Sequence, residues 1–198
     1  MHPVNAVEML VIGVSAGGVE ALGKLLPVIP GDAGLAVAIV LHIPADKPSR
    51  LAELFAARCK LQVKEVEDKE PVQANVVYLA PPDYHMLVEP DKSFSLSRDE
   101  PVYFSRPSID LLFESAAMAY RSSLLGIILT GANSDGANGL KALREAGGIG
   151  WVQDPEDAAV PVMPRSAIDT AGADRIFSLD AMATLLSRPA TLSLTRQP

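Results

Sequence analysis

The chain of 198 residues has few of the side chains that cross-link a protein or bind a metal, since it contains one cysteine and three histidines. Cys59 alone cannot form an internal disulfide, and a secreted domain of this size usually carries an even set of cysteines. The histidines, His2, His42 and His85, have no ligand-like spacing to one another or to Cys59. The sequence therefore argues against both a disulfide scaffold and a structural zinc site.

The sequence also lacks targeting and membrane signals. Its N-terminus has no basic and then apolar pattern of a signal peptide, and no apolar run approaches the length of a transmembrane helix. We expect a soluble, cytoplasmic protein with no direct membrane insertion.

Basic residues are scarce, because 17 Lys+Arg stand against 24 Asp+Glu for a formal net charge of −7. Nine acidic and four basic residues between positions 61 and 100 account for most of the excess (4 − 9 = −5). Within that segment, residues 64–70 mix both signs and predict a solvated turn. An acidic chain has no overall field to hold phosphate groups, which argues against nucleic acid or an anionic membrane surface as a partner.

Apolar residues, by contrast, are abundant: hydrophobic residues make up 48% of the chain and charged residues 21%. This balance excludes intrinsic disorder as the general description. A length of 198 residues suits one well-cored domain and leaves little room for a second. We predict a single domain over 1–198, with its core from about 8 to 187.

Strands and helices alternate along most of the chain. Short continuous apolar runs indicate strands buried on both faces, and windows with helical spacing of apolar residues follow them. The expected strands are 8–14, 35–41, 124–129, 149–153 and 174–178, and the expected helices are 18–26, 49–59 (capped by Ser49), 108–120 (capped by Ser108), 135–146, 165–171 and 181–186. The alternation predicts an α/β fold, a three-layer, doubly wound, mostly parallel sheet with helices on both faces.

Between positions 61 and 104 the alternation of strands and helices gives way to short segments broken by prolines. Apolar stretches at 75–79, 86–89 and 94–96 indicate strands of a hairpin or of a mixed sheet edge, and we expect a short antiparallel β-hairpin region around 75–97. This region is the expected exception to the parallel sheet.

The first strand runs into a glycine-rich turn, Gly13-Val14-Ser15-Ala16-Gly17-Gly18, which fits the pattern G-x-S-x-G. A sharp strand-to-helix turn can present a serine hydroxyl at the edge of a sheet only where the neighbouring backbone is uncrowded. The helix that follows points its free N–H groups at the same place, where the oxyanion of an acyl-transfer reaction would develop. Ser15 is therefore a candidate nucleophile.

The same turn has other interpretations. Ser15 could merely cap the following helix, or the turn could bind a phosphate group. A dinucleotide fingerprint fits less well, because serine occupies one glycine position. The second strand also ends at Leu41-His42, without the acidic residue that such a fingerprint needs.

Two other turns follow strands in the same way. His42 comes directly after the second strand, and Asp135 lies in the turn Thr130–Ala137 that follows a later buried strand. Taken alone, such a histidine is more often structural, and Asp135 is most simply the N-cap of its own helix. Because the carboxyl ends of parallel strands line one crevice, we expect Ser15, His42 and Asp135 to meet there. A hydroxyl, an imidazole and a carboxylate together can activate the serine.

The chain order Ser…His…Asp differs from the Ser…Asp…His order of α/β-hydrolases. The sequence instead resembles, over nearly the whole chain, the catalytic domain of the chemotaxis protein-glutamate methylesterases, the CheB family. The motifs that carry the resemblance are Ile12-Gly-Val-Ser-Ala-Gly-Gly18, His42-Ile43-Pro44, Tyr78-Leu-Ala-Pro-Pro82 with His85-Met86, Arg106-Pro-Ser-Ile-Asp110, Ile128-Leu-Thr-Gly131 with Asp135-Gly136-Ala137, and Met163-Pro164-Arg165.

The resemblance implies a serine esterase that hydrolyses glutamyl γ-methyl esters on chemoreceptors, releases methanol in chemotaxis adaptation and also deamidates receptor glutamines. In such an enzyme Ser15, His42 and Asp135 form the catalytic triad, and backbone N–H groups near Ala16 and Gly17 hold the oxyanion. The implied partner is the methylated cytoplasmic domain of a chemoreceptor, and no metal or organic cofactor is required.

The sequence departs from the family pattern at Ala16, Leu41 and Ala132, where the family usually has Thr, Gln and Met. These neighbours bear on rate and substrate fit more than on reaction type. Typical members also carry an N-terminal receiver domain, and with the candidate nucleophile at position 15 we expect none here. A second interpretation is a catalytically impaired binding or regulatory module of the same fold, and a third is nucleotide binding at the glycine-rich turn.

Four further residues in these motifs bear on the site. His85 could line its rim, although a structural hydrogen bond is favoured. Met163 is expected to pack a loop near the site, since methionine adapts to irregular gaps. Arg106 and Arg165 could contact an acidic receptor helix or be ordinary surface residues. Because the chain itself is acidic, docking on a receptor would depend on a local patch, and Arg106 is the first candidate for it.

Overall fold

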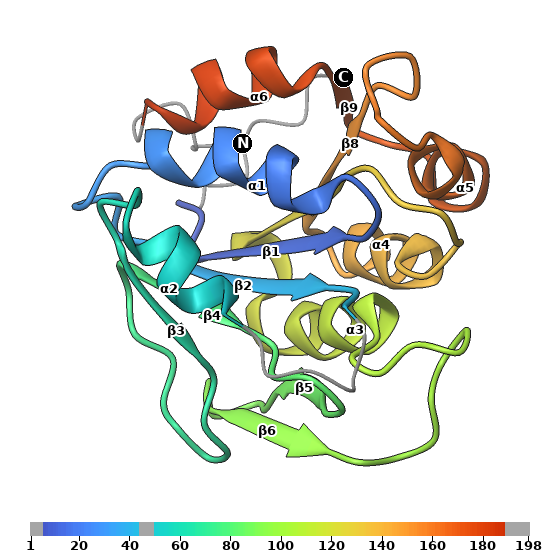
Figure 1. Cartoon of the computed structure of the whole chain (residues 1–198). Coiled ribbons are helices and arrows are strands. Elements are labelled where there is room, and N and C mark those ends of the chain that lie inside the picture. Colours follow the sequence, from blue (N-terminus) through green and yellow to red (C-terminus); the bar gives the residue numbers. More distant parts are fainter. Residues whose placement is uncertain (1–5, 44–49, 189–198) are drawn as a thin grey trace, which may run out of the picture.

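The computed structural model describes residues 6–43 and 50–188, and at its centre is a seven-stranded sheet (Figure 1). The strands follow the order β3-β4-β2-β1-β7-β8-β9, and every neighbouring pair runs parallel. Their bounds are β1 Met9–Val14, β2 Ala36–Leu41, β3 Gln62–Glu65, β4 Val76–Leu79, β7 Leu124–Ile128, β8 Ile149–Gln153 and β9 Arg175–Phe177. The α/β fold expected from the sequence is confirmed.

Helices cover both faces of the sheet (Figure 1). One face carries α1 (Gly18–Leu25), α2 (Leu51–Ala56) and α6 (Leu179–Leu186), and the other carries α3 (Ile109–Tyr120), α4 (Ala137–Glu145) and α5 (Val162–Ala171). Two short 3-10 turns, η1 (Leu26–Val28) and η2 (Arg121–Ser123), follow α1 and α3. The two sets of helices bury separate apolar clusters against the sheet, so the sheet is the middle of three layers.

Strand β1 lies in the middle of the sheet, and all six of its residues are buried. Ile12 pairs with Ile39 of β2 on one side and with Ile127 of β7 on the other. The strands β2, β3 and β4 lie on one side of β1, and β7, β8 and β9 lie on the other, so the strand order reverses between β1 and β7. In sheets of this kind, ligands bind beyond the carboxyl ends of the strands at such a reversal.

A small antiparallel sheet of β5 (His85–Val88) and β6 (Phe94–Ser97) lies beside α3. It is the hairpin expected from the sequence, but it takes up only the second part of the region 75–97. The first part is β4, which pairs with β2 and β3 in the main sheet. The four residues of β4 form a continuous buried run, which is typical of an interior parallel strand.

Several element ends differ from the sequence expectation. Lys64 and Glu65 belong to the edge strand β3 and not to a solvated turn, because one side of an edge strand faces solvent and tolerates charge. Helix α5 begins at Val162, earlier than expected, since proline is tolerated in the first turn of a helix. Ser108 does cap α3, with its side chain accepting the Leu111 N–H. Ser49, the expected cap of α2, lies outside the described residues.

Candidate active site

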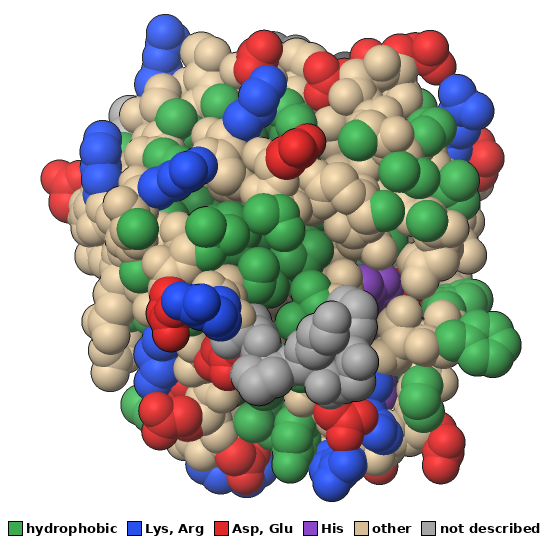
Figure 2. Space-filling view, viewed as in Figure 1, with side chains coloured by type: hydrophobic (Ala, Val, Ile, Leu, Met, Phe, Trp, Pro, Cys, Tyr) green, Lys and Arg blue, Asp and Glu red, His purple; other side chains and the backbone are tan. Residues whose placement is uncertain are grey.

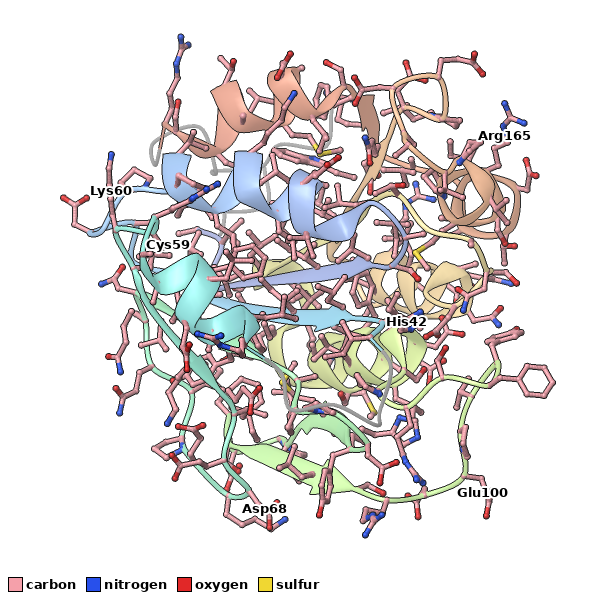
Figure 3. The ribbon with its side chains drawn as sticks, viewed as in Figure 1. His42, Cys59, Lys60, Asp68, Glu100 and Arg165 are labelled. Carbon is pink, nitrogen blue, oxygen red and sulfur yellow. The ribbon has the colours of Figure 1, made fainter. Side chains whose placement is uncertain are left out.

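The register of the sheet brings the chain at Ser15 and His42 to the same level. Val14, the last residue of β1, pairs with Leu41, the last residue of β2. The His42 N–H donates to the Val14 carbonyl (3.0 Å), and the Ser15 N–H donates to the carbonyl of Thr130, which follows β7 (3.0 Å). The three turns that were expected to carry the chemistry therefore meet at one edge of the sheet, where Figure 3 labels His42.

Thr130 holds the serine turn in place. Its hydroxyl donates to the Ala16 carbonyl (2.8 Å) and accepts the Val160 N–H (2.9 Å), which ties the turn after β1 to the segment before α5. Gly17 has a φ of 80°, and a Cβ at this position would lie 2.9 Å from the Ala159 Cβ. The turn therefore requires glycine at position 17.

Two backbone N–H groups of this turn are available to bind an anion. Ala16 and Gly17 are exposed, and within the described residues neither of their N–H groups has an acceptor. In the same part of the chain, the Ser15 hydroxyl has no hydrogen-bond partner. Because these residues directly precede α1, the positive end of the helix faces the same place. The arrangement can hold a negative oxygen next to the serine.

His42 and Asp135 share a hydrogen bond of 2.9 Å between Nε2 and Oδ2. The Asp135 side chain is fully buried, and it also accepts the Ser108 hydroxyl and the N–H groups of Ile109 and Asp110. Backbone N–H groups can only donate, so a carboxyl surrounded in this way is an ionised acceptor. The imidazole must then donate from Nε2, which leaves a lone pair on Nδ1 of His42. Nδ1 is the ring atom that can take up a proton.

Asp135 and Asp110 each cap a helix other than the one nearest to them in the sequence: Asp135 caps α3, and Asp110 caps α4. Asp135 accepts the N–H groups of Ile109 (2.7 Å) and Asp110 (3.0 Å) in the first turn of α3. Asp110 in turn accepts the N–H groups of Gly136 (2.9 Å) and Gly139 (2.7 Å) at the start of α4. The expected role of Asp135 as the N-cap of its own helix is wrong, because its side chain crosses to α3 and Gly136 occupies the N-cap position. Each acid neutralises the positive end of the opposite helix.

This exchange of helix caps places two carboxylates in one buried region. Asp110 is 4% exposed. Burial raises the pKa of Asp110 to about 6, against the opposing effect of the Gly139 N–H, and the charge of Asp135 adds to the increase. The neighbouring Glu114 also has a raised pKa, from burial first and from Asp135 second. Near pH 6 the region therefore gains or loses one negative charge at Asp110.

Replacing Asp110 by asparagine is expected to stabilise the protein at about pH 8 and to change its stability little at about pH 4. The folded-state pKa of about 6 lies above the ordinary value of 3.8, so the contribution of Asp110 is fully present below that ordinary value and is lost as the pH rises through 6. The loss amounts to about 2 to 3 kcal/mol at most, and asparagine keeps an oxygen to accept both N–H groups. Urea unfolding of both proteins at the two pH values measures the difference. Equal destabilisation at both values would contradict the expectation.

His85 and Met163 are buried residues that contact segments of the candidate active site. His85 is fully buried; its Nδ1 accepts the Ser108 N–H (3.1 Å), and its Nε2 lies 3.2 Å from the Glu100 carbonyl. Since the Ser108 N–H can only donate, Nδ1 is unprotonated and Nε2 donates to Glu100. Met163 is 1% exposed, and a Cβ on Gly131 would lie 2.7 Å from its sulfur. The structure thus places both side chains in the interior and neither on the open rim.

Arg106 is occupied by partners within the chain. Its guanidinium donates to Oδ1 of Asp83 from Nε (3.0 Å) and Nη2 (2.6 Å), and to the carbonyls of Arg98 and Asp99 (both 3.0 Å). The same guanidinium holds the pKa of Asp83 below its usual range. Arg165 forms an exposed ion pair and lies well away from His42 in Figure 3. The site therefore has no free cation at Arg106 with which to attract an acidic partner.

A pocket of about 260 Å³ opens beside His42. Figure 2 shows histidine (purple) reaching the surface there, to the right of centre. The residues that line the pocket are His42, Ile43, Asp83, Pro101, Phe104, Ser105, Arg106 and Pro107. Across residues 6–43 and 50–188, no cluster of three or more His, Cys, Asp or Glu side chains could hold a metal ion, and no helix combines the length and apolarity needed to cross a membrane.

Sequence reasoning missed three residues that support these groups. The Thr130 hydroxyl fixes the serine turn, and the Ser108 hydroxyl and the Asp110 N–H both donate to Asp135. All three lie within motifs noted in the sequence, at 106–110 and 128–131. The sequence indicated that Ser108 caps its own helix, but it did not indicate the contacts of Thr130 with Ala16 and Val160 or the contact of Asp110 with α4.

Comparison with known proteins agrees with the resemblance seen in the sequence. A family model described as CheB methylesterase matches residues 10–186. The chain is 49% identical over 181 residues to a putative protein-glutamate methylesterase/protein-glutamine glutaminase of Leptospira interrogans, a match that covers 91% of this chain and 94% of that protein. It is 34% identical over 181 residues to the protein-glutamate methylesterase/protein-glutamine glutaminase of Symbiobacterium thermophilum, covering 91% of this chain and 50% of that protein.

A solved structure agrees with the fold. The crystal structure of the Thermotoga maritima CheB methylesterase catalytic domain superposes with a TM-score of 0.86 at 31% sequence identity. The superposition covers 92% of this chain and 98% of that domain. The similarity therefore extends over the sheet and over the turns at its carboxyl edge.

Proposed function

The chain belongs to the CheB methylesterase family, and from this premise we propose that it is a serine esterase that hydrolyses γ-methyl esters of glutamyl side chains on chemoreceptors, in chemotaxis adaptation. The observation that carries the proposal is the hydrogen bond between Nε2 of His42 and the buried, ionised Asp135. It leaves a proton acceptor, Nδ1, at the edge of the sheet where the Ser15 hydroxyl lies.

The first half of the reaction forms an acyl-enzyme. Nδ1 of His42 takes the hydroxyl proton as Oγ of Ser15 attacks the γ-carbonyl carbon of the ester. The carbonyl oxygen becomes an oxyanion, which the N–H groups of Ala16 and Gly17 stabilise. The bond to the methoxy group then breaks, and methoxide takes the proton from His42 to leave as methanol.

The second half releases the product. A water molecule gives a proton to Nδ1 of His42 and attacks the acyl carbon, and Ser15 leaves with that proton. The product is a glutamate side chain, and the enzyme returns to its starting state. Throughout, Asp135 keeps the ring oriented and stabilises the imidazolium while it carries both protons.

The same residues suit the deamidation of receptor glutamines. In that reaction the amide nitrogen takes the place of the methoxy oxygen, accepts the proton from His42 and leaves as ammonia. Hydrolysis of the acyl-enzyme then gives the same glutamate product. No metal or organic cofactor takes part in either reaction.

The substrate side chains belong to the cytoplasmic domain of the receptor, and the enzyme therefore works in the cytoplasm. Residues 1–198 act as one catalytic domain. Ala16, Leu41 and Ala132, where the family usually has larger or more polar residues, tune the rate and the fit of the substrate.

The direct test is incubation of the protein with a chemoreceptor cytoplasmic domain that its cognate methyltransferase has methylated. We expect release of methanol, measured by enzymatic assay, and formation of glutamate at the methylated positions, measured by peptide mass spectrometry. A receptor with glutamine at those positions is expected to release ammonia. A serine-directed phosphonate is expected to label Ser15.

The competing interpretations give different results. A catalytically impaired module of the same fold would bind the methylated receptor without releasing methanol and would not react with the phosphonate. A nucleotide-binding turn would show thermal stabilisation by a dinucleotide and indifference to the phosphonate. Either result would overturn the proposed function.

A further inference from the structure

A tight hairpin turn stands next to the pocket at His42. Val102 and Ser105 exchange both backbone hydrogen bonds, at 3.1 and 2.8 Å, around Tyr103 and Phe104. Tyr103 and Phe104 have φ values of 47° and 61°, a left-handed conformation that bulky side chains rarely adopt. Such a backbone persists only where its surroundings hold it in place.

The hairpin is held at several points. The Tyr103 hydroxyl accepts a hydrogen bond from Asn138 on α4 (3.2 Å), and Ser105 accepts one from Asn133 (3.5 Å). Both asparagines lie within three residues of Asp135. Arg106, the residue that follows the hairpin, is bound to Asp83 and to two carbonyls. The hairpin is therefore a braced element beside the candidate active site and not part of its catalytic groups.

Phe104 is the exception within this braced element. Its side chain is fully exposed, at 104% of the reference value, whereas that of Tyr103 is 47% exposed. An exposed phenyl ring contributes nothing to the packing of the folded chain. Yet Phe104 lines the pocket that His42 also lines, together with the apolar residues Ile43, Pro101 and Pro107.

The two arginines near the hairpin are already paired. Arg98 and Arg106 both bind the carboxylate of Asp83, at 2.6 Å each. The chain as a whole carries a net charge of −7, so it offers no long-range attraction to an acidic protein. Four of the residues that line the pocket beside His42 are apolar, and one of them, Phe104, is fully exposed.

We propose that the braced hairpin Val102–Ser105 is the docking element for the substrate protein, with Phe104 packing on apolar side chains of the receptor next to the esterified glutamate. The inference rests on the proposed function, because the partner is the protein that presents its ester to Ser15. A rigid turn suits this role, since a preformed contact surface loses little entropy on binding. Aromatic residues, phenylalanine included, are also enriched in protein interfaces relative to the rest of the surface.

The test compares a protein substrate with a small one. Phe104→Asn removes the ring while asparagine tolerates a positive φ. Met118→Gln, on α3, is the matched control, since Met118 is also an exposed apolar residue (70%) and lies beyond the second turn of that helix. Each variant is assayed on the methylated receptor domain and on the γ-methyl ester of N-acetylglutamate. The loss of a buried phenyl ring lowers kcat/KM on the receptor about tenfold or more, and kcat/KM on the small ester stays within about twofold.

The outcomes separate this inference from the proposed function. Unchanged receptor kinetics in Phe104→Asn would overturn the inference, and so would an equal loss on both substrates or an equal loss in Met118→Gln. A native protein that hydrolyses the small ester but not the receptor would overturn it as well. Failure of the proposed function would be seen in the native protein, as no hydrolysis of either ester or as hydrolysis that does not depend on Ser15.

Discussion

Replacing Ser15 by alanine is expected to lower kcat for methanol release from a methylated receptor by about a millionfold, to the background rate. The hydroxyl is the group that forms the acyl-enzyme, and without it His42 and Asp135 have no nucleophile to activate. The substitution should leave the fold intact, because the Ser15 hydroxyl has no hydrogen-bond partner within the described residues. Methanol release and phosphonate labelling measure the loss, and thermal unfolding measures the fold.

A matched control lies at the same edge of the sheet. Ser134 is half-buried in the turn before Asp135, and its side chain forms no hydrogen bond in the described part of the chain. Ser134→Ala is expected to retain native activity and to react with the phosphonate as the native protein does. Substantial methanol release by Ser15→Ala, or loss of labelling in Ser134→Ala alone, would show that the nucleophile had been misassigned.

The strands that position Ser15 and His42 could be predicted because the type of element is evident from the sequence of each strand alone. Met9–Val14 and Ala36–Leu41 are continuous apolar runs, which in a chain of alternating strands and helices fit only interior parallel strands. The end of such a strand is also the end of its apolar run. Ser15 and His42 follow directly, so their positions at the carboxyl edge followed from the sequence as well.

Side chains that act across the fold could not be predicted in the same way. Asp135 precedes a helix and looks like its cap, yet its carboxylate caps α3. Asp110 lies inside the first turn of α3, yet it caps α4. The exchange depends on how closely the two helices pack, which is a property of the tertiary structure and not of either helix sequence. The edge strand β3 was missed for a related reason, since its charged residues become strand residues only through pairing with β4.

The role of Arg106 could not be predicted for the same reason, because the partners of a charged side chain depend on the tertiary structure. The sequence presents an arginine beside the candidate site, and the acidity of the chain made it the first candidate for receptor binding. In the structure its donors are already used by Asp83 and by two carbonyls, and its side chain is 20% exposed. The hydrogen bonds of Arg106 instead fix the segment that presents Phe104, so the residue contributes to docking through the position of its neighbour.

Replacing Asp135 by asparagine is expected to lower kcat by about 10⁴-fold, with a smaller effect on KM. The carboxylate accepts from four donors, among them Nε2 of His42 and the N–H groups of Ile109 and Asp110. Asparagine has one oxygen and one NH₂ group. If its oxygen takes the place of Oδ1, where it accepts the Ser108 hydroxyl and the Asp110 N–H, its NH₂ group takes the place of Oδ2 and faces both Nε2 and the Ile109 N–H. The imidazole must then move its proton to Nδ1 to accept from the NH₂ group. The ring then has no lone pair to offer Ser15.

A second measurement on Asp135→Asn can show whether the hydrogen bond between His42 and residue 135 is lost together with the activity. The Nε2–H proton of His42, held by an ionised carboxylate, should give a low-field NMR resonance in the native protein that Asp135→Asn loses. Asp174→Asn is the control, because Asp174 is an acid, half-buried where Asp135 is fully buried, that also accepts a backbone N–H. The donor is Gly150 at the start of β8, and thus at the opposite edge of the sheet. Asp174→Asn should keep both the resonance and native kcat, although it weakens the ion pair with Arg144 and lowers stability. If Asp135→Asn kept native kcat while losing the resonance, the ring would not depend on Asp135 for its tautomer, and the assignment of Nδ1 as the base would have to be abandoned.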